Sequence, residues 1–393
     1  MRVVLFYSDV ESFNYFTDQI EAELRRRLNE VFILDLRNPE GENEHSYQKF
    51  VQFAENVVDV AIAFDGIGIK EDLFIELWDL QGTIAVNILM DHPLRFHPTM
   101  QKHPKRYLQF CCDHNHVVYV KNYFADCVSN VSFLPHAGTF VDCNNIVPLG
   151  ERQYDILFSG TYYKPEEQLA KINEWFEPGS AMNQFYHVMA QYLIENYTVP
   201  TEQAVLDTLE ILGMQVEESS LKTIMRCAEP IDWMVRMYYR EKVIATLADS
   251  GQDIWLLGRG WENHPSAGKK NVHRIADRIP FQETLAYMAN AKINLNVMPW
   301  FKAGTHDRIF NILLQHSLPF TDTSEWINEN YVSGKELVIY DLGNLEALPE
   351  QVENLLSDEV RMEAMIQCGY EKTRKNYTWI QCVDQIIKGI SNI

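Results

Sequence analysis

The 393-residue sequence is poor in positive charge and has no long apolar run. Lysine and arginine total 34 against 55 aspartates and glutamates, which leaves a net charge of -21. Such a chain repels nucleic acid and anionic lipid, and no basic patch of useful size offsets this repulsion. The longest apolar stretches, at residues 57–64 and 83–90, are too short to span a bilayer. Because the sequence enters a strand pattern directly, without a signal-peptide pattern, we expect a cytoplasmic protein with no transmembrane segment and no nucleic-acid partner.

Cysteine is also scarce and unpatterned. The seven cysteines include no CxxC pair and lie in apolar surroundings, as reduced core residues do. Cys111 and Cys112 lie near His114 and His116 in the sequence. Adjacent residues of a strand point to opposite faces, however, so joint ligation of a metal ion there would be awkward. We therefore expect no metal site in this stretch.

What the sequence does contain is an alternation of strand and helix patterns. With 46% hydrophobic and 23% charged residues, it has a globular composition and enough apolar material for two domains. Over residues 1–147 the alternation predicts a doubly wound α/β domain with a parallel sheet. Its predicted strands are residues 3–7, 31–36, 58–64, 83–90, 108–112 and 131–134. Its predicted helices are residues 13–28, 47–56, 71–78 and 117–123.

Polar residues follow these strands, at the carboxyl ends where open α/β sheets bind ligands. Aspartate is also a common turn residue, so at any single position a turn role is the simpler explanation. Histidine has no comparable turn preference, and its recurrence at strand ends favours a binding rim. The residues predicted to form this rim are Asp9, Asp65, Asp91, His92, Asp113, His114 and His136.

A second alternating unit begins after the Pro-Leu-Gly break at residues 148–150, so we place the domain boundary at residue 147. Its first strand, residues 155–158, ends in Ser159 and Gly160. Residues 166–247 then lack strand signals and have helical periodicity, which predicts a helical insertion. Its predicted helices are residues 168–176, 182–197, 202–212 and 219–247. The insertion could serve acceptor recognition or dimer contacts, and a plain packing layer is the simpler explanation.

The clearest strand, loop, helix and strand unit lies at residues 292–322. Gly304 is expected to permit a tight turn, and Thr305 or Asp307 to cap a helix with an apolar face. A helix N-terminus presents free backbone N–H groups and a partial positive charge, so this loop is a candidate diphosphate site, although any βαβ protein has loops of this kind. The polar side chains beside it are Lys302, His306 and Arg308.

A glycine-rich loop follows the predicted strand at residues 254–257. Gly258 and Gly260 would let the backbone approach a ligand closely, and Arg259 between them could bind phosphate. A lone Gly-Arg-Gly sequence is weak evidence by itself. The remaining predicted strands are residues 272–275, 318–320 and 337–340, and the remaining helices are residues 281–291, 348–356, 358–376 and 379–390.

Several stretches of the C-terminal half carry a family resemblance: LLGRGW, IPFQETLAYMANAKINLNV, GTHDRIFNILLQHSLPFTD, KELVIYDLGNLEALPEQVENLL and GYEKTRKNYTW. They resemble CgeB-like, spore-maturation-type glycosyltransferases of the GT-B superfamily, from residue 155 to the C-terminus apart from the helical insertion. The resemblance implies two Rossmann-like domains facing across a cleft. Residues 148–378 would hold a nucleotide-diphosphate sugar and residues 1–147 a hydroxyl acceptor. A final helix at 379–393 would cross back to the N-terminal domain, and no cofactor or obligatory metal would be needed.

Carried over by position, His306, Asp307 and Arg308 match the family's helix-start motif, and Gly258 with Arg259 fits its second glycine-rich loop. Asn311 falls where many relatives have a glutamate that holds the donor ribose. A neutral amide can still bind a ribose hydroxyl, but the acidic pair of retaining GT-B enzymes is absent. The residues predicted to bind the donor are Ser159, Gly160, Gly258, Arg259, Gly260, Lys302, Gly304, Thr305, His306, Asp307, Asn311 and Asp322.

The predicted activity is that of a hexosyltransferase-like enzyme acting on a protein, a surface glycan or a small molecule. The chemistry requires charge neutralisation on the departing diphosphate and, if inverting, a base near the acceptor hydroxyl. Arg308 and Arg259 could meet the first need, and Asp91 with His92 the second, with Asp9 in reserve. A non-catalytic sugar-nucleotide-binding partner, an epimerase on the same fold, and a homo-oligomeric state remain open alternatives.

Overall fold

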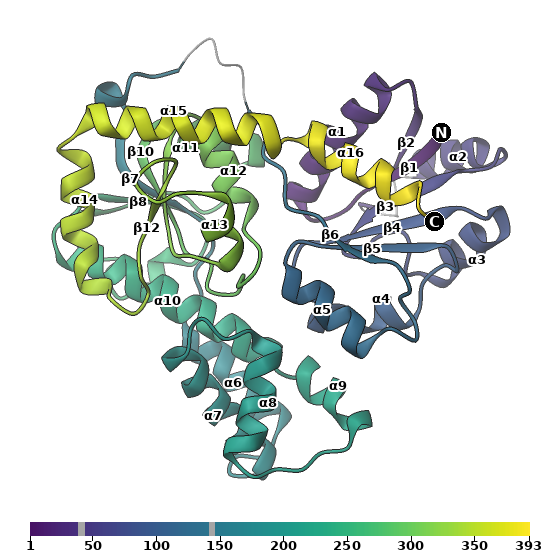
Figure 1. The fold of residues 1–393 in the computed structure, drawn as a ribbon, viewed down its shortest axis with the longest axis horizontal. Coiled ribbons are helices and arrows are strands. Elements are labelled where there is room, and N and C mark those ends of the chain that lie inside the picture. The colour runs from purple at the N-terminus through teal and green to yellow at the C-terminus, as the bar shows by residue number, and fades with distance from the viewer. Residues whose placement is uncertain (38–43, 141–145) are drawn as a thin grey trace. The chain divides into compact units, whose positions relative to one another are not determined.

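The structure, a computed structural model, describes residues 1–37, 44–140 and 146–393, which form two compact units (Figure 1). One unit contains Met1–Ala137 together with Tyr377–Ile393, and the other contains Gly138–Asn376. Each unit is built on a six-stranded sheet in which all neighbouring strands are parallel. This confirms the predicted α/β class with two doubly wound, Rossmann-like sheets. Within the described ranges, no helix combines the length and apolar character that crossing a membrane requires.

The sheet of the first unit has the strand order β2-β1-β3-β4-β5-β6. Every residue of β3, β4 and β5 is buried, because helices that connect parallel strands cover both faces of such a sheet. The strands are β1 (Arg2–Tyr7), β2 (Glu30–Asp35), β3 (Val60–Phe64), β4 (Ile84–Leu89), β5 (Tyr107–Cys111) and β6 (Val131–Phe133). The helices are α1 (Glu11–Arg26), α2 (Glu44–Ala54), α3 (Asp72–Gln81), η1 (Pro93–Phe96), α4 (His97–Gln101), α5 (His114–Tyr123) and α16 (Trp379–Ile390).

Helix α16 is the last helix of the chain but belongs to the first unit, where it packs beside α1 (Figure 1). The ring centroids of Trp379 and Phe16 are 5.2 Å apart. Arg27 Nη2 forms an ion pair with Asp384 Oδ1 at 2.8 Å. Gly389 leaves no room for a side chain, because a Cβ there would lie 2.8 Å from the ring of Phe110. The end of the chain is therefore part of the core of the first unit.

The sheet of the second unit has the order β12-β11-β10-β7-β8-β9. Its strands are β7 (Tyr154–Ser159), β8 (Ile254–Leu257), β9 (Val272–Ala276), β10 (Ala291–Asn296), β11 (Leu318–Thr321) and β12 (Val338–Ile339). Its short 3₁₀ turns are η3 (Leu149–Glu151), η4 (Trp261–Asn263) and η5 (Leu345–Ala347). The helices that follow β9 are α11 (Phe281–Ala289), α12 (Asp307–Leu314), α13 (Glu325–Asn330), α14 (Leu348–Leu356) and α15 (Glu359–Asn376).

The predicted helical insertion is present between β7 and β8. It consists of α6 (Pro165–Trp175), α7 (Ala181–Glu195), α8 (Thr201–Ile211), α9 (Glu218–Arg226) and α10 (Glu229–Asp249). The single helix predicted over 219–247 is wrong, since the structure has two helices that break at Cys227 and Ala228. The break has a local cause, because Pro230 lies in the first turn of α10, where a proline begins a helix readily. Helix α10 then returns to pack on β8.

Candidate functional site

Buried polar residues collect at the carboxyl ends of three neighbouring strands of the second unit. Ser159 ends β7, Asn296 ends β10 and Asp322 follows β11. All three side chains are at most 6% exposed. In open parallel sheets, this edge is where ligands bind. The sequence had placed Ser159 and Asp322 at such a site and had not identified Asn296.

Arg308 reaches this edge from the start of α12. Its Nη1 donates a hydrogen bond to Asn296 Oδ1 at 2.6 Å, and its guanidinium carbon lies 5.5 Å from the ring centroid of Phe158. Gly160 lies alongside, since a Cβ there would be 3.3 Å from Arg308 Nη2. Burial lowers the pKa of Arg308, while the charges of Asp307 and Asp322 raise it. The structure therefore brings Ser159, Gly160 and Arg308 together.

His306 caps α12, which corrects the predicted cap at Thr305 or Asp307. His306 Nδ1 accepts the hydrogen bond of Arg308 N at 3.1 Å, as a serine or aspartate oxygen does at most helix starts. Burial lowers the pKa of His306, which favours the neutral ring that this role needs. Thr305 is buried with its hydroxyl 3.7 Å from Met298 Sδ, and Asp307 is the first helical residue. Because the cap occupies one of the helix-end N–H groups, the arginine side chains become the main candidates for anion binding.

A second arginine, Arg240 of α10, lies beside Arg308 and was missed by the sequence analysis. Its guanidinium carbon lies 5.2 Å from the ring centroid of Phe158, so one aromatic ring contacts both cations. Its Nη1 donates to the carbonyl oxygen of Thr161. Burial, reinforced by the charges of Arg308 and Arg236, lowers the pKa of Arg240 to about 9. Arg240 therefore stays charged at neutral pH inside a site that disfavours its charge.

A signal in the sequence could have identified Arg240. Met237 and Ile244, three positions before it and four after it, are fully buried, so Arg240 occupies the apolar stripe of its helix. A charged residue is almost never fully buried unless it has a partner. The helical period predicted the helix, but the position of an arginine on its buried face was overlooked.

The arginine cluster, Arg240 with Arg308, has carboxylates nearby but is not paired with one. In the part of the chain that the structure describes, neither arginine forms a salt bridge, and Arg240 Nε and Ser159 Oγ are buried without a hydrogen-bond partner. Buried polar groups without partners are rare and call for an explanation. A ligand with several anionic oxygens, such as a diphosphate, would satisfy both guanidiniums and the hydroxyl.

The glycine-rich loop after β8 has a packing role. A Cβ on Gly258 would lie 2.3 Å from Gly160 O, and a Cβ on Gly260 would lie 1.9 Å from Tyr162 O. Both glycines also have positive φ, at 135° and 85°. The close backbone approach that the sequence assigned to a ligand is thus between two loops of the protein. Arg259, between them, is exposed at the surface.

Asn311, the predicted ribose ligand, is engaged within the fold. Its Oδ1 accepts from Thr139 N at 2.9 Å, and its Nδ2 donates to Asp307 Oδ2 at 3.0 Å. The side chain is 1% exposed. Contact with a ribose would require one of these bonds to be exchanged. Gly304, also assigned to the donor, contributes its carbonyl oxygen to the hydroxyl of Ser324 at 2.6 Å.

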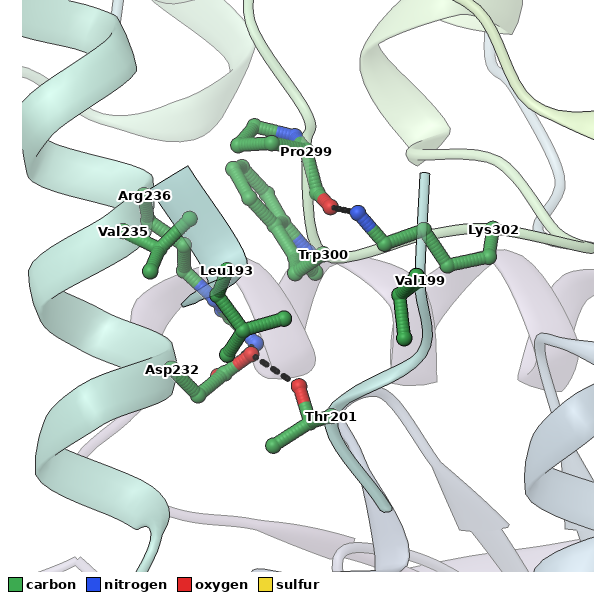
Figure 2. Close-up of a pocket in the computed structure, with 9 residues that line it drawn as sticks. All are labelled: Leu193, Val199, Thr201, Asp232, Val235, Arg236, Pro299, Trp300 and Lys302. Atoms are coloured by element: carbon green, nitrogen blue, oxygen red, sulfur yellow. Dashed lines mark hydrogen bonds and ion pairs between the residues drawn. The ribbon is translucent and has the colours of Figure 1, made fainter. Parts of the chain in front are cut away.

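Lys302 and its neighbours join the site loop to the helical insertion. Lys302 Nζ donates to the carbonyl oxygens of Tyr197 and Pro299, and Figure 2 shows the second of these bonds. In the same view, the ring of Trp300 lies between Lys302 and Arg236, whose guanidinium carbon is 4.4 Å from the Trp300 ring centroid. The space left between these residues is only about 10 Å³, room for about one water. This contact is a packed joint that fixes the loop after β10.

In the first unit, the four predicted aspartates follow β1, β3, β4 and β5, which are neighbours in the sheet. Asp9 is exposed, whereas Asp65 and Asp113 hold the backbone: Asp65 Oδ1 accepts from Met90 N and Asp113 Oδ1 accepts from Asn115 N. The last of these bonds caps α5. The turn roles weighed from the sequence are therefore real at Asp65 and Asp113.

The catalytic candidates of this rim also make local contacts. Asp91 Oδ2 pairs with Arg95 Nη1 at 3.0 Å, and the Asp91 side chain remains 30% exposed. His92 is buried and its Nδ1 accepts from Leu94 N at 3.0 Å, which caps η1. His114 is exposed and stacks on Phe133, with ring centroids 3.8 Å apart, and His136 is buried.

Asp65 makes the stability of the protein depend on pH. Burial, with the nearby charge of Asp91, raises the pKa of Asp65 to about 7. An unfolded aspartate titrates near pH 4, so the folded state holds an extra proton between about pH 4 and 7 and loses stability as the pH rises through that window. Asp65→Asn keeps the acceptor for Met90 N, tolerates the φ of 49°, and cannot ionise. We compare the unfolding free energy of Asp65→Asn with that of wild type at each pH. We expect this difference to be about 1–2 kcal/mol more favourable to the variant at pH 8 than at pH 4.

Urea unfolding of wild type and Asp65→Asn at pH 4, 6 and 8 measures this gain. Asp9→Asn, an exposed position on the same rim, is the matched control and should change none of the midpoints. An Asp65→Asn effect of equal size at all three pH values would show that the carboxyl does not titrate in this range.

Comparisons with known proteins agree with the fold described above. Residues 240–388 match a family model described as "Glycosyl transferase-like", and no curated protein matches the sequence. Sucrose-phosphate synthase from Thermosynechococcus elongatus superposes with a TM-score of 0.57 at 9% identity, covering 100% of this chain and 98% of that one. Anabaena Alr3699/HepE in complex with UDP gives 0.55 at 10% identity, with 100% of both chains covered. An alpha-glucosyltransferase in complex with UDP and a 13-mer DNA gives 0.55 at 11%, covering 100% and 99%. At these identities the likeness establishes a shared fold.

Proposed function

From the GT-B glycosyltransferase fold of this chain, we propose that it transfers a hexosyl group from a nucleotide-diphosphate sugar to a hydroxyl acceptor, without a metal ion. The observation that carries this proposal is the arginine cluster at the carboxyl ends of the second sheet. Arg240 and Arg308 are buried cations that form no salt bridge with any described residue. UDP is bound to HepE and to the alpha-glucosyltransferase, two proteins with this fold, which supports a nucleotide diphosphate as the anion.

The proposed chemistry follows from where charge develops. The bond between the anomeric carbon and the diphosphate oxygen breaks, and negative charge grows on the departing diphosphate. Arg308 and Arg240 would stabilise that charge, because preorganised donors in a desolvated site act most strongly where charge increases. Two guanidiniums also supply the positive charge that a divalent cation supplies in metal-dependent transfer. Metal independence is therefore part of the proposal.

The acceptor hydroxyl must lose its proton as it attacks. We assign this task to Asp91 with His92 on the rim of the first unit, with the acceptor held by Asp9, Asp65, Asp113, His114 and His136. Since His92 Nδ1 accepts from Leu94 N, a neutral His92 carries its proton on Nε2. The Asp91 carboxylate would therefore take the proton, and His92 Nε2–H would donate to the acceptor oxygen. The acceptor would be a hydroxyl of a protein, a glycan or a small molecule.

Nucleoside diphosphates should stabilise the protein against heat. A ligand at one hundred times its Kd adds about 2.7 kcal/mol of stability, which is a readily measured rise in Tm. We expect diphosphates to exceed monophosphates, and nucleosides to give no rise, because the arginine cluster recognises the phosphates. A thermal-shift screen with UDP, ADP, GDP and their mono- and unphosphorylated forms makes the measurement.

If no nucleoside diphosphate raises Tm, the assignment of the donor site is wrong. If diphosphates bind but a donor sugar is never consumed with any acceptor, the non-catalytic binding protein becomes the better explanation. Release of free nucleoside diphosphate without an acceptor would favour the epimerase.

A further inference from the structure

A pocket of about 240 Å³ lies in the second unit, between the helical insertion and the ends of β11 and β12. It is distinct from the small packed joint of Figure 2, although both include Lys302 and Pro299. The polar and aromatic residues that dominate its lining are Tyr197, Lys302, Asp322, Glu325, Tyr340 and Asp341.

Asp322, one of the residues that line this pocket, carries an unsatisfied hydrogen-bonding group. The residue is 1% exposed, and its Oδ1 accepts from Met298 N at 2.8 Å. Its Oδ2 is buried and has no hydrogen-bond partner among the residues that the structure describes. Leaving a buried carboxylate oxygen unpaired costs free energy, so a donor supplied by a ligand would be favoured.

The charges around the pocket determine which hydrogen-bond donors a ligand can place there. Asp322, Glu325 and Asp341 outnumber Lys302, whose Nζ already donates to two carbonyl oxygens. Tyr197 donates its hydroxyl to Asp341 Oδ1. Such a lining offers acceptors to hydroxyl or amino groups, and it repels a carboxylate or phosphate.

The pocket adjoins the arginine cluster through shared residues. Tyr340 OH donates to Asn296 O at 2.7 Å, and Asn296 Oδ1 accepts from Arg308 at 2.6 Å. Asp322 also acts electrostatically on both Arg240 and Arg308. One ligand with an anionic end and a hydroxylated end can therefore contact both places.

We propose that this pocket receives the sugar of the donor and selects neutral or amino sugars over sugars that carry a carboxylate. The inference rests on the proposed function, because it places the diphosphate on Arg240 and Arg308. Burial raises the pKa of Asp322 to about 7, so near neutral pH the carboxyl can both donate to and accept from sugar hydroxyls. The 240 Å³ volume falls below the range of drug-sized sites and suits one monosaccharide unit.

Calorimetry with UDP, UDP-glucose, UDP-glucosamine and UDP-glucuronate tests the selection, with the ADP or GDP series substituted if that diphosphate gives the larger thermal shift. We expect UDP-glucose and UDP-glucosamine to bind at least about tenfold tighter than UDP-glucuronate, since a group that leaves buried polar partners unpaired is rejected strongly. In Asp322→Asn the ratio of the affinity for UDP-glucose to that for UDP-glucuronate should fall about tenfold. Asp253→Asn, an exposed carboxylate of the same unit, is the control and should keep the wild-type ratio.

The outcomes separate this inference from the proposed function. If the wild type binds no nucleoside diphosphate, the proposed function is overturned. Tight UDP binding with equal affinity for glucose and glucuronate would overturn only the pocket assignment. The wild-type comparison stands by itself if Asp322→Asn does not fold.

Discussion

Arg308→Ala should lower kcat/KM for sugar transfer by about two to three powers of ten, as the loss of one preorganised donor to a transition-state charge does. The charge of the leaving diphosphate grows in the transition state, and Arg308 is held at the strand ends by its hydrogen bond to Asn296. Alanine preserves helix propensity in α12. Single-turnover transfer and Tm, measured together, separate a catalytic loss from unfolding.

Two further variants sharpen this test. Arg308→Lys retains a charge but not the forked geometry of a guanidinium, so we expect it to recover only part of the rate. Arg374→Ala removes an exposed arginine from α15 and should leave transfer unchanged. The alternative explanation from the sequence was that Arg308 pairs with Asp307 or Asp322. The structure instead gives it an amide partner, and a fully active Arg308→Ala protein would remove Arg308 from the mechanism.

Arg240→Met should weaken binding of a nucleoside diphosphate about a hundredfold and should not destabilise the free protein. A bidentate, desolvated contact to phosphate accounts for a loss of that size. The free protein pays a desolvation cost for Arg240, which the lowered pKa of about 9 reflects, and methionine removes that cost while keeping most of the side-chain volume. Calorimetric titration with UDP and urea unfolding without ligand make the two measurements.

Arg236→Met is the matched control, one turn earlier on the same helix. Arg236 Nη2 pairs with Asp232 Oδ2 at 2.7 Å, and both side chains are 3% exposed. Removing one partner of a buried ion pair leaves an uncompensated charge, so this variant should lose about 3–5 kcal/mol of stability. If Arg240→Met is destabilised as strongly as Arg236→Met, Arg240 has a structural role.

The fold could be predicted because each buried parallel strand has a recognisable pattern within its own residues. Buried runs that are wholly apolar, as in β3, or apolar apart from one asparagine, as in β4, are flanked by polar turn residues, so each strand was identifiable from its own sequence. The helical insertion was equally recognisable from the helical spacing of its apolar residues. The break between α9 and α10 was not anticipated, although Pro230 marks it.

The site was less predictable because its parts are joined by contacts between distant residues. Gly258 and Gly260 fit a ligand loop by sequence, and only the structure reveals that they contact Gly160 and Tyr162. Arg240 is separated from Arg308 by β8, β9, α11 and β10 along the chain, so nothing local links the two. Asn311 had a functional role by resemblance, and its bond to Thr139 could not be inferred from either residue alone.

The position of α16 bears on how the protein is made. The first unit consists of Met1–Ala137 and Tyr377–Ile393, so the second unit is in effect inserted into the first. During synthesis the ribosome completes all of Gly138–Asn376 before Trp379 can cover Phe16 on α1. Domains generally fold in the order in which they emerge, but here the unit that emerges first can finish only last. Its α1 face must stay exposed through most of translation, and a chain terminated before residue 377 would never bury it.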